Sequence, residues 1–162
     1  MSAKRLNTRR SRHASFLLDE NIQSDTLAIR LREIPGWDIQ LHADHLQPST
    51  SDADVVALCS ENSWGLITID EMRYTDDTKR AMVQGNVRLF KVITHERTHY
   101  MHIVASLVIA QARMLEIMHK NKFACCAHVY TNGDVSIVSR FADIPPGLTP
   151  QQQKTYLKFG KV

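Results

Sequence analysis

Two short apolar runs, each followed directly by an aspartate, constrain the fold more than any other feature of the sequence. Residues 16–18 are followed by Asp19, and residues 66–69, apolar apart from Thr68, are followed by Asp70. A short, continuous apolar run is typical of a strand that is buried on both faces, as in parallel sheets. We therefore expect two central strands of a parallel sheet, with Asp19 and Asp70 at their carboxyl ends.

Strand and helix patterns alternate through the middle of the chain. We expect strands at residues 16–18, 37–41, 66–69 and 87–94, and helices at residues 22–34, 52–59, 75–84 and 100–120. Two further strand patterns, residues 127–131 and 135–141, flank Asn132 and Gly133, a pair that favours a hairpin turn. This order predicts an α/β fold with three α/β/α layers, a mostly parallel central sheet and a C-terminal β-hairpin.

The two ends of the chain differ from its middle in composition. Residues 1–14 are basic and nearly free of apolar side chains, which predicts a flexible arm. Its Arg9, Arg10 and Arg12 are candidates for binding a phosphate backbone, and a solvated tail without a partner is the alternative. Residues 145–162 are expected to form an extended tail rich in proline and glutamine. Residues 15–144 then form one domain, a common size for a single folded unit.

Cysteine usage and hydropathy indicate a cellular compartment. The sequence has three cysteines without the spacing of a metal site, so we expect reduced thiols in a cytoplasmic protein. Residues 103–110 are apolar apart from Ser106, but a bilayer span needs about 20 such residues. We therefore expect no membrane partner.

Acidic residues gather where one edge of the predicted sheet would lie. Asp19 and Asp70 end strands, and two further pairs open helices that begin at the same edge: Asp52, Asp54, Asp76 and Asp77. Ligand sites of open α/β sheets form at this edge. Carboxylates that converge there repel one another unless a cation neutralises them. Oxygen ligands suit Mg²⁺ or Mn²⁺, and such an ion can orient a phosphodiester and activate water.

The helix positions also have a structural explanation. An acidic residue in the first turn of a helix is stabilised by the helix dipole without any ligand. This explanation applies to each of the four helix acids taken singly. It does not apply to Asp19 and Asp70, since an acid that directly follows a buried run has no packing purpose.

Three segments taken together resemble the motif blocks of the PIN-like domain family, small bacterial relatives of the VapC-type toxin ribonucleases. They are residues 16–21 (FLLDEN), 51–56 (SDADVV) and 65–70 (GLITID), in that order. The resemblance covers residues 15–141. It implies a PIN-like fold, a Mg²⁺ or Mn²⁺ site and single-stranded RNA as the substrate class of an endoribonuclease.

The resemblance also implies roles for individual residues. Asp19, Asp52 and Asp70 would be the catalytic metal ligands, and Asp54 would be a reserve beside Asp52. Asp76 or Asp77 would assist. A toxin role, with an antitoxin protein as partner, is one hypothesis within this family.

One position departs from the family pattern. The family usually has a second aspartate two residues after Asp70, followed by an aromatic residue, but this chain has Met72 there and Tyr74 one position late. Glu71, Asp76 or Asp77 would have to substitute for the missing acid. The second hypothesis is therefore a catalytically silent PIN-like module that binds RNA or a partner protein.

Basic and apolar helix faces suggest further contacts. Arg73, Lys79 and Arg80, together with Arg88, are candidates for holding phosphates near the metal site, with a solvated helix face as the alternative. The apolar face of the helix at residues 100–120 is expected to be core. Its excess of apolar residues leaves room for a homodimer contact.

Residues 95–99 (HERTH) match the His-Glu-x-x-His pattern of zinc metalloproteases. That chemistry needs His95 and His99 on one helical face, Glu96 as the general base and a further ligand. The pattern directly follows a predicted strand, so its first half is expected to be loop. A zinc metalloprotease is thus the third hypothesis, and a polar helix start containing His95, His99 and His102 is the structural alternative.

Overall fold

The computed structural model describes residues 13–22, 24–72, 75–95, 98–121, 123–141, 149 and 151–152. The elements follow in this order: β1 (Ala14–Leu18), α1 (Asp25–Arg32), β2 (Trp37–Leu41), a 3-10 turn (His42–Asp44), α2 (Asp52–Asn62), β3 (Gly65–Thr68), α3 (Asp76–Gly85), β4 (Arg88–Val92), α4 (Tyr100–Lys120), β5 (Ala124–Val129) and β6 (Val135–Phe141). Most of the predicted arm and tail, including Arg9, Arg10 and Arg12, lies outside the described residues.

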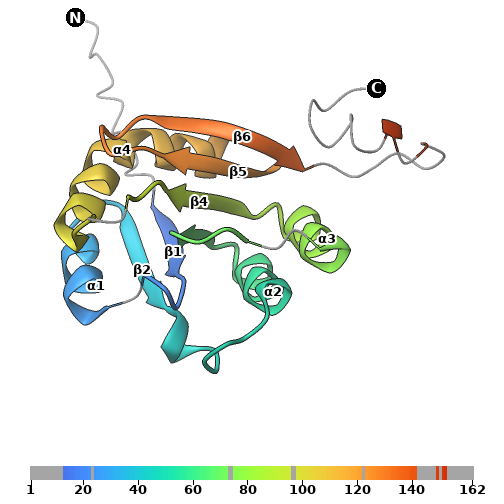
Figure 1. Cartoon of the computed structure of the whole chain (residues 1–162), viewed down its shortest axis with the longest axis horizontal. Helices are drawn as coiled ribbons and strands as arrows, with labels where there is room; N and C mark the ends of the chain where they lie inside the picture. The colour runs from blue at the N-terminus through green and yellow to red at the C-terminus, as the bar shows by residue number, and fades with distance from the viewer. Residues whose placement is uncertain are drawn as a thin grey trace, which may run out of the picture.

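One sheet joins all the strands of the described chain (Figure 1). Its order is β2-β1-β3-β4-β5-β6, and only the last pair, β5 with β6, is antiparallel. Leu18 of β1 lies opposite Ile67 of β3, so these two strands end side by side. The predicted mostly parallel α/β sheet with a C-terminal hairpin is confirmed.

Successive strand residues face opposite layers of helices. Leu18, Ile67 and Phe90 belong to a core cluster on the face covered by α1 and α4. Leu17 and Leu66 belong to a second cluster on the face covered by α2 and α3. Figure 1 shows the two helix pairs on opposite sides of the sheet. Both faces of the central strands are buried, which is why their sequences are continuous apolar runs.

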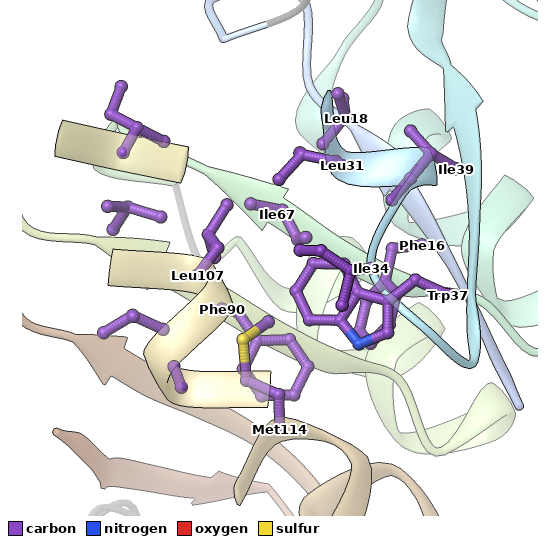
Figure 2. Close-up of a cluster of buried hydrophobic side chains, with 14 of the residues drawn as sticks. Phe16, Leu18, Leu31, Ile34, Trp37, Ile39, Ile67, Phe90, Leu107 and Met114 are labelled. Carbon is purple, nitrogen blue, oxygen red and sulfur yellow. The ribbon is translucent and has the colours of Figure 1, made fainter. Parts of the chain in front are cut away.

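Aromatic rings fill the centre of the first cluster. The ring of Phe16 lies 4.5 Å from that of Trp37 and 5.8 Å from that of Phe90, measured between centroids. Figure 2 shows these rings beside Ile34 and Met114. Burying one such side chain contributes about 1.5–3 kcal/mol to folding. This cluster therefore anchors β1, whose end carries Asp19.

A side chain caps the start of each helix α1 to α4. Ser24, Ser51 and Thr75 accept a backbone N–H through their hydroxyl oxygens, and His99 accepts one through Nδ1. Such a cap contributes about 1 kcal/mol. Because each helix follows a parallel strand, all four helices begin at the carboxyl edge of the sheet.

Some predicted boundaries were wrong. The first hairpin strand begins at Ala124 rather than at residue 127, so Cys125 and Cys126 pair with Arg88 and Leu89 of β4. Pairing with β4 decides their conformation. The first helix begins at Asp25 rather than at residue 22 because Ser24 caps it. The three cysteines are free and buried, as the expectation of reduced thiols requires.

Helix α4 is the longest helix in the described chain and is apolar enough by composition to cross a membrane. It has 21 residues, an 18-residue stretch of it has a mean hydropathy of 1.4, and 39% of that stretch is buried inside the protein. Its inward residues Ile103, Leu107, Ala110 and Met114 belong to the first core cluster. A core helix of a soluble domain has the same composition, so this is weak evidence for a membrane. Val108 and Ile109 lie on its exposed side, and the homodimer contact stays a prediction.

Candidate active site

Asp19 lies at the end of β1 and is tied to β3. Its backbone N–H donates to the carbonyl of Ile67, at 3.0 Å. Its carboxylate accepts hydrogen bonds from the Thr68 hydroxyl at 2.8 Å and from the Glu20 N–H at 2.9 Å. Thr68 is fully buried. The carboxylate is therefore held by neighbours on two strands.

The same threonine connects Asp19 to Asp70. The Thr68 hydroxyl oxygen accepts the backbone N–H of Asp70 at 3.1 Å while its proton is donated to Asp19. The Asn21 side-chain amide donates to the Asp70 carboxylate. Two segments 51 residues apart in sequence (19 and 70) are thus joined by one hydroxyl and one amide. The structure brings together the two residues that sequence reasoning singled out at strand ends.

The surroundings of Asp19 change its acidity. Burial raises the pKa of the Asp19 carboxyl group, and the negative charge of Asp70 adds to this increase. This increase is partly offset by the hydrogen bonds from Thr68 and Glu20 and by the charge of His42, all of which lower the pKa of Asp19. Two nearby carboxylates, one of them partly desolvated, favour a bound cation over two isolated negative charges.

His42 and Cys59 flank Asp19 and were missed by sequence reasoning. His42 is buried in the 3-10 turn after β2, and within the described residues its Nε2 atom is buried without a hydrogen-bond partner. Cys59 is a buried residue of α2, and burial, followed by the charge of Asp19, raises the pKa of its thiol to about 12. His42 could have been found by the rule that selected Asp19, because it directly follows a strand.

Two pockets open at the carboxyl edge of the sheet, one of them beside His42. One, of about 510 Å³, is lined by Glu20, Asn21, His42 and residues of the loop after β2. The Ser49 N–H donates to the Glu20 carboxylate at 2.9 Å and ties this loop to the end of β1. The other pocket, of about 330 Å³, lies between the starts of α2 and α3 and includes Asp52. Both volumes are within the range of ligand pockets.

The acids at the start of α2 have different surroundings. Asp52 is partly exposed and lines the smaller pocket. Asp54 accepts the Ser51 hydroxyl at 2.6 Å, while its own N–H donates to that oxygen at 3.2 Å. Asp54 therefore has a local capping role, as the alternative to metal binding predicts.

The charged residues of α3 lie at the surface. Asp76 and Asp77 are exposed, and the Arg80 guanidinium lies 3.3 Å from the Asp77 carboxylate. An exposed pair of this kind contributes at most about 1 kcal/mol. Lys79 is half-buried on the same helix. Arg73 lies outside the described residues.

Arg88 has a structural role instead of the suggested phosphate contact. Its guanidinium donates to the carbonyls of Asn86 and Asn121, the cap residues after α3 and α4. Burial lowers the pKa of Arg88. Helix ends leave carbonyls that need such donors.

The residues after Asp70 explain the departure from the family pattern. Met72 is buried in the second core cluster with residues of α2 and α3. Glu71 is exposed, and its carboxylate accepts a hydrogen bond from the Lys91 ammonium, which lowers the pKa of Glu71. Tyr74 lies outside the described residues. No group of three or more His, Cys, Asp and Glu side chains in the part of the chain that is described could hold a metal ion as the side chains stand.

The zinc-protease pattern does not have the geometry that its chemistry needs. His95 precedes α4 in an irregular segment, and His99 is the cap residue of that helix. The two imidazoles therefore do not share a helical face. Glu96 lies outside the described residues. The structure agrees with the alternative of a polar helix start.

Comparison with protein families gives a match over the first four strands. Residues 14–93 match a family model described as a PIN-like domain, a segment that runs from β1 to just past β4. It contains all the acids of the predicted metal site. No curated protein matches the chain. No solved structure matches it either.

Proposed function

Because the chain belongs to the PIN-like domain family through residues 14–93, we propose that it is a metal-dependent endoribonuclease. The family supports a nuclease-type fold. The proposed substrate is single-stranded RNA, the proposed cofactor is Mg²⁺ or Mn²⁺, and the proposed compartment is the cytoplasm. The single observation that carries the proposal is the hydrogen-bonded link Asp19–Thr68–Asp70 between the ends of β1 and β3.

The residues present fit a hard cation. Asp19 and Asp70 offer carboxylate oxygens, the ligands that Mg²⁺ and Mn²⁺ prefer. The raised pKa of Asp19, which results from burial and from the charge of Asp70, is the electrostatic state that a cation relieves. When bound, the ion supplies Lewis acidity and charge neutralisation for phosphodiester hydrolysis.

The chain's own residues supply orientation. Thr68 fixes one oxygen of Asp19, and the Glu20 N–H holds the other, so the carboxylate has one preferred direction. Asn21 holds Asp70 in the same way. Asp52 completes the proposed set from the start of α2, and Asp54, Asp76 and Asp77 are proposed as assisting acids at the same edge. Fixed polar groups of this kind need no reorganisation when charge develops on the reacting phosphate.

Replacing Asp19 tests the proposal. Asp19→Asn keeps an oxygen for Thr68 and removes the charge, so we expect cleavage of a single-stranded RNA oligonucleotide with Mn²⁺ to fall by at least about 10³-fold. Asp38→Asn is the matched control, because Asp38 also accepts a side-chain hydrogen bond on a neighbouring strand. Undiminished Mn²⁺-dependent cleavage by Asp19→Asn, with its metal affinity unchanged in calorimetry, would refute the site.

A specific observation favours a second candidate, the silent RNA-binding or protein-binding module. Met72 is buried in the core where the family has an acid, and Asp54 is engaged by Ser51. Calorimetry with millimolar Mg²⁺ and Mn²⁺ separates the two candidates. No binding of either ion, together with RNA binding in EDTA, would select the silent module.

We further propose that the ribonuclease acts as the toxin of a toxin–antitoxin pair. This role is supported by the family resemblance and is tested in cells. Expression of the wild-type chain should arrest growth, while Asp19→Asn should not. If cells expressing an active wild-type enzyme grow normally, the ribonuclease proposal stands. The toxin role, and with it the antitoxin partner, would then be refuted.

A further inference from the structure

We propose that Lys91 binds the phosphate of the RNA at this site and that Glu71 holds its ammonium group when no RNA is bound. The inference rests on the proposed function, which it deepens by assigning the phosphate contact to β4. Lys91 lies outside the three motif segments and was not selected from the sequence.

The register of the sheet places Lys91 beside the acids. Thr68 of β3 lies opposite Lys91 of β4, which in turn lies opposite His128 of β5. Residues opposite one another on parallel strands point to the same face. Thr68 is the residue whose hydroxyl binds Asp19. Lys91 is therefore the next side chain along the same polar row at the carboxyl edge.

The ammonium of Lys91 lies at the surface although its stem is buried. Only 14% of the Lys91 side chain is exposed, yet its ammonium donates to Glu71, whose side chain is 87% exposed. A hydrogen bond to a solvated carboxylate requires the ammonium itself to be at the rim. Glu71 directly follows Asp70, about 3.8 Å along the backbone. The positive charge is thus tethered to the candidate site.

This ion pair differs from the other ion pairs of the described residues. Those pairs join residues three or four positions apart on the helices or at their ends, and their cations are 51–67% exposed. Lys91 lies on β4 and Glu71 in the segment after β3, and the Lys91 side chain as a whole is largely buried. A lysine on a central strand occupies a position where an apolar residue would pack better. Stabilisation by a surface pair does not account for it.

The chemistry of the ammonium fits a phosphate. It carries three N–H donors, so one bond to Glu71 leaves it able to bind a further oxygen. Neighbouring strands lie about 4.8 Å apart, which puts the backbones at Asp19 and Lys91 about 10 Å from each other. Side chains from the two positions can flank one phosphodiester. Lys91 then attracts the phosphate that the acids, by charge alone, would repel.

His128 completes the surroundings of the ammonium. Burial and the charge of Lys91 lower the pKa of His128, and Glu71 opposes this change. A lower pKa favours the neutral ring, which does not compete electrostatically with Lys91. Its ring also lies 6.2 Å from that of Tyr130, edge to face. The polar row thus ends in an aromatic pair at the carboxyl end of β5.

The test measures RNA affinity without metal. Fluorescence anisotropy with a single-stranded RNA oligonucleotide in EDTA compares the full-length wild type with Lys91→Met, Lys91→Arg and Glu71→Gln. Lys120 and Glu116 form a matched exposed pair at the far end of α4, so Lys120→Met and Glu116→Gln are the controls. We expect Lys91→Met to weaken binding about tenfold and to reduce the salt slope by about one, because one phosphate contact is lost.

The other variants give further expected results. Lys91→Arg should retain binding within about threefold, and Glu71→Gln should tighten binding, because the ammonium is released and a repelling charge is removed. Neither control should change the affinity. With Mn²⁺, Lys91→Met should lower kcat about 100-fold while the Mn²⁺ affinity in calorimetry is unchanged.

Each outcome decides between the proposals. Wild-type affinity and salt slope in Lys91→Met would overturn the Lys91 contact even if the protein cleaves RNA. RNA binding that depends on Lys91 without any cleavage would uphold the contact and refute the nuclease. If the wild type does not bind RNA, the proposed Lys91–phosphate contact is refuted. The nuclease proposal is then tested separately by whether the wild type cleaves RNA. If Lys91→Met does not fold, an unchanged affinity of Glu71→Gln would overturn the contact.

Discussion

The acids at the ends of the strands and the acids at the starts of the helices share one edge of the sheet, but they are held differently. Asp19 and Asp70 are joined through Thr68, so their positions depend on the pairing of β1 with β3. Asp54 and Asp77 are bound by Ser51 and Arg80, three residues away on the same chain segment. Local bonds account for Asp54 and Asp77. The strand acids are instead linked across two strands, which supports the functional role proposed for them.

The largest expected effect separates Asp70 from Asp77. Asp70→Asn should reduce metal-dependent cleavage about 10²–10³-fold, because it removes a proposed ligand that has no substitute at position 72. Asp77→Asn should lower cleavage far less, since Asp77 is exposed, is paired with Arg80 and is proposed only to assist. Initial rates with a labelled RNA oligonucleotide and Mn²⁺ measure both. Equal losses of cleavage rate in Asp70→Asn and Asp77→Asn would refute the distinction between strand acids and helix acids.

A pair of buried threonines tests whether the link itself matters. Thr68→Val removes the hydroxyl between Asp19 and Asp70, and should lower cleavage about tenfold or more and the free energy of unfolding by about 1–3 kcal/mol. Thr78→Val is the control, because Thr78 is also buried and hydrogen-bonded, but to the cap residue Thr75. It should lower stability without a comparable loss of cleavage. Urea denaturation and the cleavage assay together show whether activity follows the link or the stability.

Much of this arrangement follows from the sequence, for reasons that differ between residues. Asp19 and Asp70 could be predicted because a buried strand ends directly before each of them. Asn132 and Gly133 identified the hairpin because few residue pairs fit its backbone, and Gly133 has φ of 84°. These features depend only on neighbours in the chain.

The remaining parts of the site depend on contacts that the sequence does not contain locally. Thr68 was expected to be an ordinary strand residue, and its role arises from the β1–β3 register. Lys91 becomes important only when β4 lies beside β3. Met72 departs from the motif in sequence, but its burial in the core required the packing of α2 and α3. Register and packing are properties of the folded chain as a whole.

Removing a helix cap should have a smaller effect and should leave the chemistry intact. Ser51→Ala removes the oxygen that binds the Asp54 N–H, and should lower the free energy of unfolding by about 1 kcal/mol. Ser24→Ala removes the equivalent cap of α1 and should cost about the same. If Asp54 serves only the cap, both variants keep wild-type cleavage. A loss of cleavage in Ser51→Ala but not in Ser24→Ala would indicate that Asp54 also contributes to the metal site.

The smallest expected effect is a pH dependence of stability that belongs to the strand acids. Burial raises the pKa of Asp19 in the folded protein above its value of 3.8 in an unfolded chain. The folded state therefore binds the proton more tightly, and the stability that this contributes is fully present below pH 3.8 and is lost as the pH rises through the folded pKa. In EDTA, Asp19→Asn should thus gain stability relative to the wild type as the pH rises through that range. Thermal unfolding of both proteins from pH 3 to pH 7 measures the difference, and Mn²⁺ should reverse it by stabilising only the wild type. A difference that is constant with pH would show that Asp19 is as well solvated as an exposed acid, and the contrast between strand and helix acids would then rest on hydrogen bonding alone.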